Sequence, residues 1–287
     1  MNDSITKPRL SIITVNMNNA GGLRKTIESV VSQTFTDFEY IIIDGSSTDG
    51  SVEVIKEFAD RITFWVSEPD MGIYNAMNKG ILKSNGEYLQ FLNSGDWLVD
   101  KNVLLNVFEN FTLADISYGH LIKVNRDKSE AITYQAPSEK KLTFAHFYFD
   151  SLPHPSTFIL RELFKDQLYD EEYTIAADKK FFVDKIIIQN CSIKQLDCVI
   201  ACFNTDGISH SLKNQALIQE ENSRIIAQLV PPRIASDYEL LSAIKHSTLV
   251  KYIPQLAKTN RFQILVTGIV AILLKLYLLI NFKKWKQ

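Results

Sequence analysis

Residues 38–50 read FEYIIIDGSSTDG, and this stretch decides the fold class. The residues up to Asp44 are mainly apolar and rich in isoleucine, which is typical of a strand buried on both faces of a parallel sheet. The polar turn that follows leads into a predicted helix at residues 51–58, which Thr48 or Asp49 could cap. A strand, a tight turn and a helix in this order form one repeat of an α/β protein.

The same alternation extends in both directions from this stretch. Before it, residues 9–15 (RLSIITV) predict a strand and residues 23–32 a helix. After it, strands at residues 62–67 and 87–92 enclose a helix at residues 73–83. Such β-α-β-α order implies a parallel sheet with right-handed crossovers. We therefore predict an α/β fold in which helices flank a mostly parallel central sheet.

The pattern changes after a helix predicted at residues 102–111. The later elements that we expect are a hairpin at residues 116–134, strands at 157–160 and 199–203, and helices at 175–188 and 212–229. Pro231-Pro232 then breaks the chain. The predicted organisation is a domain over residues 1–230, with halves at 8–112 and 113–230, followed by a C-terminal helical segment over 231–287.

The composition is that of a globular protein, with 46% hydrophobic and 22% charged residues among 287. A net charge of −2 gives no indication of a nucleic-acid partner, and we predict none. Three cysteines without C-x-x-C spacing argue against a disulfide framework or a zinc site. The N-terminus lacks a basic stretch followed by an apolar one, so we predict no signal peptide and expect the body in the cytosol.

The C-terminal region has a different character. Residues 262–282 (FQILVTGIVAILLKLYLLINF) carry one charge, and a helix of this length would span roughly 30 Å, about the hydrocarbon thickness of a bilayer. Residues 245–287 contain eight Lys or Arg and no Asp or Glu, and basic residues flank both ends of the apolar run. We predict a membrane-associating helix that either spans the membrane or lies in it. A soluble core helix is the alternative.

Polar side chains follow the predicted strands, among them Asn16, Asp44, Asp70 and Asp96. The carboxyl ends of parallel strands share one rim, where open α/β sheets bind their ligands. The loop at residues 16–22 (NMNNAGG) matches neither the GxGxxG nor the GxxxxGK[ST] phosphate-binding pattern. A metal ion held by a carboxylate is therefore the expected means of offsetting a diphosphate charge, and Asp96 is placed to hold it.

Taken together, these motifs resemble the family 2 inverting glycosyltransferases, which have the GT-A fold. The resemblance covers about residues 8–210 and rests on residues 11–16 (SIITVN), 44–50 (DGSSTDG), 68–80 (EPDMGIYNAMNKG), 91–96 (FLNSGD), 154–157 (HPST) and 177–178 (AD). The last two stretches are similar to a branch of the family that builds bacterial surface polysaccharides. The resemblance implies a Rossmann-like nucleotide-binding half followed by an acceptor-binding half.

The resemblance also implies roles for single residues. Asp44 would accept a hydrogen bond from the uracil of a UDP-sugar, or from the equivalent edge of another base, and Thr14 and Asn16 would contact the nucleoside. Asp96 would bind Mg²⁺ or Mn²⁺ at the diphosphate, and His210 would reach the metal or a phosphate. The other residues implied in binding the substrates are Ser46, Asp70, Tyr74, Asn75, Lys79, Asn93, Ser94 and His154.

Asp178 is implied as the general base, which takes the proton of the acceptor hydroxyl during in-line attack on the anomeric carbon. An acidic residue that merely favours a helix start is its alternative, and Lys79 and His154 have structural alternatives too. The sequence departs from the family pattern where Asn93 replaces the first acid of the DxD motif and Asn75 replaces an Asp. Ala177 also stands where many relatives have Glu.

The expected function is the transfer of one sugar from a nucleotide-sugar to a hydroxyl of a polyprenyl-diphosphate-linked glycan. A UDP-sugar is the favoured donor. The reaction is expected at the cytoplasmic face of the inner membrane, because an apolar tail with basic flanks suits an acceptor confined to the bilayer. One rival is a sugar nucleotidyltransferase, although residues 16–23 lack the cation that such enzymes carry after the first strand. The other is a non-catalytic sugar-nucleotide-binding assembly subunit, which the altered DxD motif favours. The oligomeric state stays open.

Overall fold

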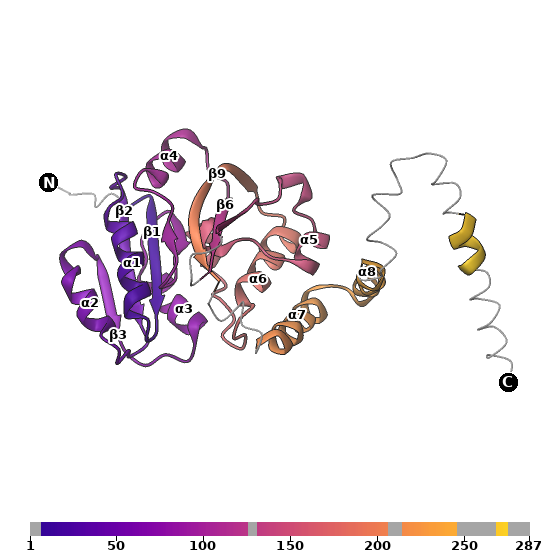
Figure 1. Ribbon diagram of the computed structural model, residues 1–287, viewed down its shortest axis with the longest axis horizontal. Coiled ribbons are helices and arrows are strands. Elements are labelled where there is room, and N and C mark those ends of the chain that lie inside the picture. The colour runs from indigo at the N-terminus through magenta and orange to yellow at the C-terminus, as the bar shows by residue number, and fades with distance from the viewer. Residues whose placement is uncertain (1–6, 126–130, 206–213, 246–267, 275–287) are drawn as a thin grey trace. The chain divides into compact units, whose positions relative to one another are not determined.

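The computed structural model of the protein describes residues 7–125, 131–205, 214–245 and 268–274 (Figure 1). The chain divides into two compact units, residues 1–230 and 231–287. The strands of the first unit are β1 (Leu10–Asn16), β2 (Phe38–Asp44), β3 (Phe64–Ser67), β4 (Tyr88–Phe91), β5 (Trp97–Leu98), β6 (Ile116–Val124), β7 (Ala131–Tyr134), β8 (Thr157–Leu160) and β9 (Ile193–Asn204). Its α-helices are α1 (Ala20–Val31), α2 (Ser51–Glu57), α3 (Ile73–Lys83), α4 (Val103–Asn110), α5 (Phe144–Phe149), α6 (Ala177–Phe182) and α7 (Gln215–Leu229).

The centre of the sheet forms where the sequence is most apolar. Every residue of β1 is buried, as is every residue of β2 except the first. The two strands pair in parallel, and their register places Asn16 directly beside Asp44 at the carboxyl ends. Helix α1, which connects them, begins after Asn19, whose side-chain oxygen accepts the N–H of Gly22 at 3.2 Å. The predicted rim of polar residues is therefore present at this edge of the sheet.

The sheet is mixed rather than mostly parallel, which corrects the prediction for the second half of the domain. Its strand order is β3-β2-β1-β4-β8-β6-β9-β5, and β7 pairs with β6. The strands from β3 to β4 are parallel as predicted. However, β8 is antiparallel to both β4 and β6, and β5 is antiparallel to β9. Strand direction here depends on long-range pairing, which four apolar residues such as those of β8 do not specify on their own.

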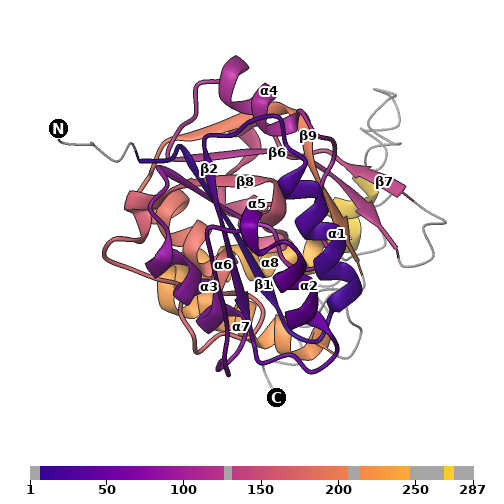
Figure 2. The same cartoon turned by 90° about the vertical axis from the view of Figure 1, so that its left-hand side faces the viewer.

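Helices cover both faces of this sheet (Figures 1 and 2). Helices α3, α5, α6 and α7 contribute to the core on one face, together with Ile13 and Ile41 of the central strands. Helices α1, α2 and α4 pack on the other face with Ile12 and Ile42. This division follows from the alternation of side chains along a strand. The rim at the carboxyl ends of β1, β2 and β4 consequently lies between two helical layers.

In the second unit the structure describes α8 (Pro232–Lys245) and a helical stretch at residues 268–274. Apolar side chains are exposed in both, including Leu240 on α8 and Ile272 and Leu273 in the shorter stretch. Within the described ranges, none of the helices combines the length and the apolar character needed to cross a bilayer. Most of the apolar helix predicted at residues 262–282 lies outside the described residues, so membrane association stays a prediction.

Candidate active site

Asp44, at the carboxyl end of β2, holds the loops of the rim together. Its buried carboxylate accepts hydrogen bonds from Asn16 Nδ2 (2.6 Å), from the Ser47 N–H (2.9 Å) and hydroxyl (2.6 Å), and from the Ser67 hydroxyl (2.6 Å). Burial by itself raises the pKa of Asp44, but these hydrogen bonds outweigh it and lower the pKa below its ordinary value. Four donors fill the acceptor sites of a carboxylate. Asp44 therefore organises the loop, and Ser46 lies exposed beside it with a φ of 56°.

Asp70 approaches the same loop from the connection between β3 and α3. Its Oδ1 accepts the N–H of Gly72 at 2.9 Å. Its Oδ2 lies over Gly45, where an added Cβ would be only 2.5 Å from this oxygen. Within the described part of the chain, Oδ2 accepts no hydrogen bond. Asp70 therefore keeps an oxygen that can accept the N–H group of a ligand. Asp44 has no such oxygen, because protein donors occupy both of its oxygens.

Two residues predicted to bind the sugar donor are already engaged with other side chains. The ammonium group of Lys79 forms an ion pair with Glu68 at 2.7 Å. The amide nitrogen of Asn75 donates to Glu171 Oε2 at 2.8 Å. The Lys79 ion pair braces the connection between β3 and α3, whereas the Asn75 hydrogen bond joins α3 to the segment before α6.

Asp96 follows β4 and is buried, with 5% of its surface exposed. One of its carboxylate oxygens accepts the N–H of Asn204 at 2.9 Å. Burial raises the pKa of Asp96 to about 7, and the hydrogen bond from Asn204 only partly opposes this. A buried carboxyl group with so little compensation favours a proton or a cation.

Asn93 and Ser94 form the turn that leads to Asp96. The Ser94 carbonyl accepts a hydrogen bond from Asn19 Nδ2 at 3.0 Å, which ties the turn to the start of α1. The side-chain oxygen of Asn93 is buried and lacks a partner among the described residues. Over the ranges that the structure covers, no three His, Cys, Asp or Glu side chains gather to hold a metal ion. His210, predicted to reach the metal, lies outside the described residues.

Asp178 lies in the first turn of α6. Its Oδ1 is 2.8 Å from the Tyr74 hydroxyl, which is also 2.6 Å from the carbonyl oxygen of Ile175. The hydroxyl has one proton, so it donates to one of these acceptors at a time. Burial, reinforced by the charge of Asp178, raises the pKa of Tyr74 well above its ordinary value, which keeps the phenol protonated. Because α3 starts directly after the loop of Asp70, Asp178 lies on the α3 side of the same rim.

His154 precedes β8 and packs close to Asp178. Its ring stacks on Phe91 of β4, with ring centroids 4.9 Å apart, and its Nε2 is 2.9 Å from the Tyr169 hydroxyl. Burial lowers the pKa of His154, although the negative charge of Asp178 opposes this. The imidazole is therefore largely neutral at pH 7 and suits an aromatic wall beside the carboxylate.

The structure does not bring Thr14 to the rim. The side chain is fully buried, and its hydroxyl donates to the Leu92 carbonyl at 2.8 Å and lies 3.0 Å from the Tyr40 hydroxyl. Alternation along β1 directs Thr14 into the core on the α1 side. Its position therefore argues against the predicted contact with a nucleoside, whereas Asn16 and Asp44 are the last residues of their strands and Asp70 and Asp96 follow theirs.

Two charged groups near Asp178 were missed by the sequence analysis. Lys179 is 7% exposed, and burial lowers its pKa to about 8 against the opposing charges of Asp178 and Asp150. Glu221 on α7 is 2% exposed, and its carboxylate accepts the N–H groups of residues 174–176. Lysine and glutamate in polar helices are ordinarily solvated, so only the fold shows that these two are buried.

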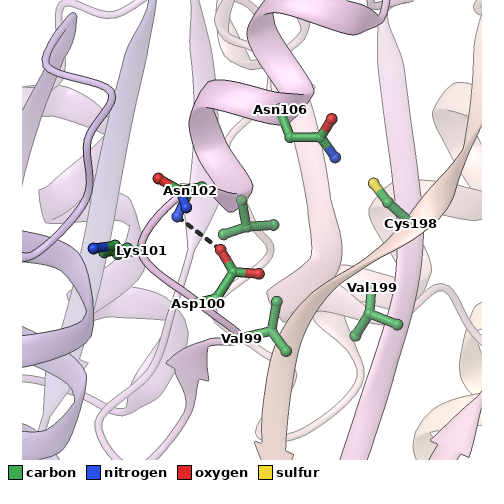
Figure 3. Close-up of a pocket in the computed structure, with 8 residues that line it drawn as sticks. Val99, Asp100, Lys101, Asn102, Asn106, Cys198 and Val199 are labelled. Atoms are coloured by element: carbon green, nitrogen blue, oxygen red, sulfur yellow. Dashed lines mark hydrogen bonds between the residues drawn. The ribbon is translucent and has the colours of Figure 1, made fainter.

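A cavity of about 600 Å³ opens away from this rim, between the turn before α4 and the middle of β9 (Figure 3). Its lining includes Asp100, whose carboxylate accepts the N–H of Asn102 at 2.7 Å. Cys198 lines it as well, and at about 3.3 Å per residue it lies roughly 20 Å along β9 from Asn204, the neighbour of Asp96. We therefore place the chemistry at the rim and not in this cavity.

Comparison with known proteins agrees with this arrangement. An uncharacterised glycosyltransferase of Mycobacterium tuberculosis is 30% identical over 210 residues, which are 70% of this chain and 77% of that protein. A PGL/p-HBAD biosynthesis glycosyltransferase of Mycobacterium bovis is 26% identical over 220 residues, covering 74% of this chain and 83% of the relative.

Solved structures show the same fold at lower identity. TarS 1-349 of S. aureus, in complex with UDP-GlcNAc, superposes with a TM-score of 0.60 at 18% identity, over 78% of this chain and 68% of that one. The mannosyltransferase PcManGT of Pyrobaculum calidifontis, in complex with GDP-Man and Mn2+, gives a TM-score of 0.55 at 14% identity, over 92% and 84%. The chain thus shares the fold of these two transferases.

The family is shown by the sequence itself. Residues 11–168 match the family described as Glycosyl transferase family 2. The chain therefore belongs to this family and is a glycosyltransferase, which confirms the resemblance that the sequence motifs indicated.

Proposed function

We propose that the protein transfers a sugar from a nucleotide-sugar to a hydroxyl of a lipid-linked glycan, with inversion at the anomeric carbon. The observation that carries this proposal is the placement of Asp178, whose carboxylate contacts Tyr74 on the helix that begins at the Asp70 loop. A carboxylate from the second half of the domain thereby lies beside the Asp70 loop of the first half. This is the arrangement that attack by an acceptor hydroxyl on a bound sugar donor requires.

The sugar donor is best placed with its base between the loops after β1, β2 and β3. Related folds have been solved with UDP-GlcNAc and with GDP-Man and Mn2+, which supports a nucleotide-sugar as ligand. The acceptor sites of Asp44 are filled by protein donors, so we assign the base N–H to Asp70 Oδ2, which accepts no hydrogen bond from the described residues. Asp44 then acts through the loop that it holds.

The residues at Asp96 fit a divalent cation. The carboxyl group is buried, accepts one backbone hydrogen bond and has a raised pKa. A bound cation would compensate the negative charge of its ionised form, which the protein itself compensates only in part. Mg²⁺ is commonly held by one or two carboxylates together with substrate phosphates. Asp96, with His210 as a further candidate, would hold Mg²⁺ or Mn²⁺ at the diphosphate. Such an ion stabilises the negative charge of a departing nucleoside diphosphate.

Asp178 would accept the proton of the attacking hydroxyl while the new bond from its oxygen to the anomeric carbon forms. The bond from that carbon to the diphosphate oxygen breaks at the same time, and the nucleoside diphosphate leaves with the electron pair. His154, stacked on Phe91, lies near the carboxylate, and Tyr74 fixes the orientation of the carboxylate. A correctly placed base of this kind contributes about 10²–10⁴-fold to the rate.

The acceptor and the location of the reaction are part of the same proposal. The apolar residues 262–282 and the eight basic residues of 245–287 support an acceptor held in a membrane with anionic lipids. A polyprenyl-diphosphate-linked glycan of cell-surface polysaccharide synthesis meets this description, and the reaction would take place at the cytoplasmic face of the inner membrane. The exposed apolar side chains at residues 269–274 are consistent with it.

The test combines product analysis with two variants. Purified protein is mixed with UDP- and GDP-sugars, a polyprenyl-diphosphate-sugar acceptor and Mn²⁺, and the released nucleotide is identified. We expect release of UDP or GDP, a loss of at least about 10²-fold in the Asp178→Asn variant, and an unchanged affinity of that variant for the sugar donor. The control variant is Asp184→Asn, which removes another acid from the continuation of α6. Diphosphate as the released product, or full turnover by Asp178→Asn, would refute the proposal.

A further inference from the structure

Glu221 is a buried acidic residue that the proposed mechanism does not yet use. It lies on α7, where 2% of its surface is exposed, and it is 45 residues from Ala176 along the chain. Its two carboxylate oxygens accept three consecutive backbone N–H groups, from Thr174 at 2.6 Å, Ile175 at 3.0 Å and Ala176 at 2.9 Å. Charge-assisted hydrogen bonds of this kind are roughly twice as strong as neutral ones. They offset the cost of burying the carboxylate.

These three N–H groups belong to the residues that lead directly into α6. Ala176 occupies the N-cap position of the helix, and its carbonyl accepts the N–H of Lys180. The carbonyl of Ile175 is one of the two acceptors next to the Tyr74 hydroxyl, and Asp178 provides the other. Glu221 and Tyr74 thus hold the same peptide unit between Ile175 and Ala176, Glu221 at its N–H and Tyr74 at its carbonyl.

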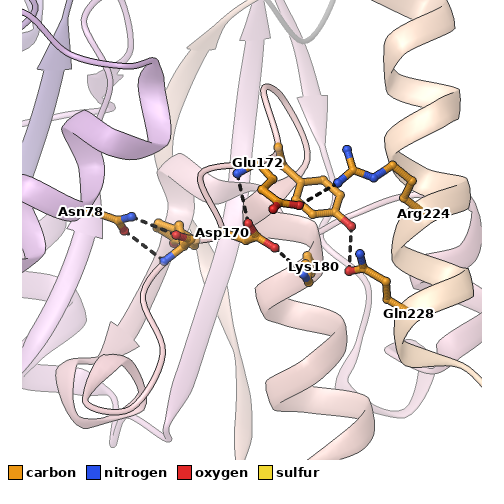
Figure 4. Close-up of polar contacts among 8 residues, drawn as sticks. Asn78, Asp170, Glu172, Lys180, Arg224 and Gln228 are labelled. Atoms are coloured by element: carbon orange, nitrogen blue, oxygen red, sulfur yellow. Dashed lines mark hydrogen bonds and ion pairs between the residues drawn. The ribbon is translucent and has the colours of Figure 1, made fainter.

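The rest of the segment before α6 is also held from two sides (Figure 4). From α3, the buried side chain of Asn78 exchanges two hydrogen bonds with the backbone of Tyr169, at 2.9 and 3.0 Å. From α7, Arg224 pairs with Glu172 at 3.2 Å. The segment is therefore a rigid bridge between α3 and α7, with Glu221 at its final residues.

We propose that Glu221 is a positioning residue for Asp178: by holding residues 174–176, it sets the start of α6 and hence the place of the base relative to the bound sugar donor. This inference rests on the proposed function of Asp178. A misplacement of a reacting group by about 1 Å can cost on the order of 10²-fold in rate. The loops assigned to the nucleotide are held by contacts of their own, such as the hydrogen bonds to Asp44, and these do not involve Glu221.

The first experiment measures transfer by the Glu221→Gln variant of the full chain. Glutamine has the same shape, but it replaces one acceptor oxygen by an N–H₂ group that faces backbone N–H groups. We expect kcat to fall about 10- to 100-fold and the Kd for the sugar donor with Mn²⁺ to change less than twofold. The matched control is Glu220→Gln, which neutralises the exposed neighbour and should leave both quantities unchanged.

A double-mutant comparison separates positioning from general damage. If Glu221 acts through Asp178, then Glu221→Gln lowers the rate little further in a chain that already carries Asp178→Asn. A full additional loss in that background, a parallel loss of affinity for the sugar donor, or normal turnover of Glu221→Gln would each overturn the proposal.

The second experiment needs no turnover. Hydrogen exchange of the peptide that covers residues 170–180 should become at least tenfold faster in Glu221→Gln than in the parent, while exchange in β1 and β2 stays the same. If exchange accelerates in this way but the parent transfers no sugar from any nucleotide-sugar, the proposed function fails, while the anchoring of residues 174–176 by Glu221 stands. Unchanged exchange at residues 170–180 would refute this anchoring.

Discussion

Lowering the pH from 8 to 6 is expected to weaken the binding of Mn²⁺ about tenfold, because the cation must displace a proton from Asp96. With a pKa of about 7 in the ligand-free protein, the carboxyl group is about 90% ionised at pH 8 and about 9% ionised at pH 6. The apparent affinity scales with the ionised fraction, so the difference is about 1.4 kcal/mol. The same proton should be released on binding, about 0.9 per ion at pH 6 and about 0.1 at pH 8.

Isothermal titration of Mn²⁺ in two buffers with different ionisation enthalpies measures both the affinity and the number of protons. The titration is done with a nucleotide-sugar present, because its doubly esterified diphosphate does not titrate between pH 6 and 8. The Asp96→Asn variant is the control and should bind more weakly, with a smaller dependence on pH in this range. A wild-type affinity that is constant from pH 6 to 8, or a pH dependence in Asp96→Asn as large as that of the wild type, would refute the assignment.

The raised pKa of Asp96 also predicts how stability depends on pH without a ligand. Between about pH 4 and pH 7 the folded chain keeps the proton that the unfolded chain has lost, so this group contributes less stability as the pH rises. Above pH 7 the ionised carboxylate is buried, at a cost of roughly 1–4 kcal/mol. Asp96→Asn should therefore raise the melting temperature of the ligand-free protein at pH 8 and leave it unchanged near pH 4. Thermal unfolding followed by circular dichroism distinguishes these outcomes.

Three further predictions address the neighbouring contacts. Gly45→Ala places a Cβ 2.5 Å from Asp70 Oδ2, so the partly exposed carboxylate must move. The affinity for the sugar donor should then fall about tenfold, or about 1.4 kcal/mol, while the melting temperature stays nearly constant. A large loss of stability would contradict this. Tyr74→Phe removes the hydroxyl between Asp178 and Ile175 and should lower kcat more than it changes donor affinity, with Tyr40→Phe on the opposite face as the control. Asn78→Ala removes its paired hydrogen bonds with the Tyr169 backbone and should cost about 2–4 kcal/mol in chemical denaturation, because buried partners are left unsatisfied.

The nucleotide-binding half could be predicted from sequence because its elements are local and strongly patterned. The helix predicted at residues 73–83 is α3 without a shift at either end, and the central strand pair follows two apolar runs. The order of polar residues after these strands gave the rim, since parallel strands end on one edge. Thr14 was assigned to this rim as well, and the alternation of side chains along β1 buries it instead.

The second half depends on contacts that a local pattern does not contain. The strand predicted at residues 199–203 begins six residues earlier as β9, because the polar residues Lys194 and Gln195 pair with the start of β6. Glu221 shows the same limit for the site. It is one of two adjacent glutamates in a polar helix, and only the fold distinguishes the buried one from its exposed neighbour.

The anchoring of residues 174–176 by α7 sets a practical lower limit on how far the chain can be shortened. The family motifs end near residue 178, yet a shortened protein that stops before α7 would remove the Glu221 acceptor of three N–H groups next to the proposed base, and that of Ala176 is buried. A version ending after Val230 keeps Glu221, Arg224 and Gln228 with their partners. A shortened protein without the apolar tail should therefore end at the Pro231-Pro232 break and not at the last family motif.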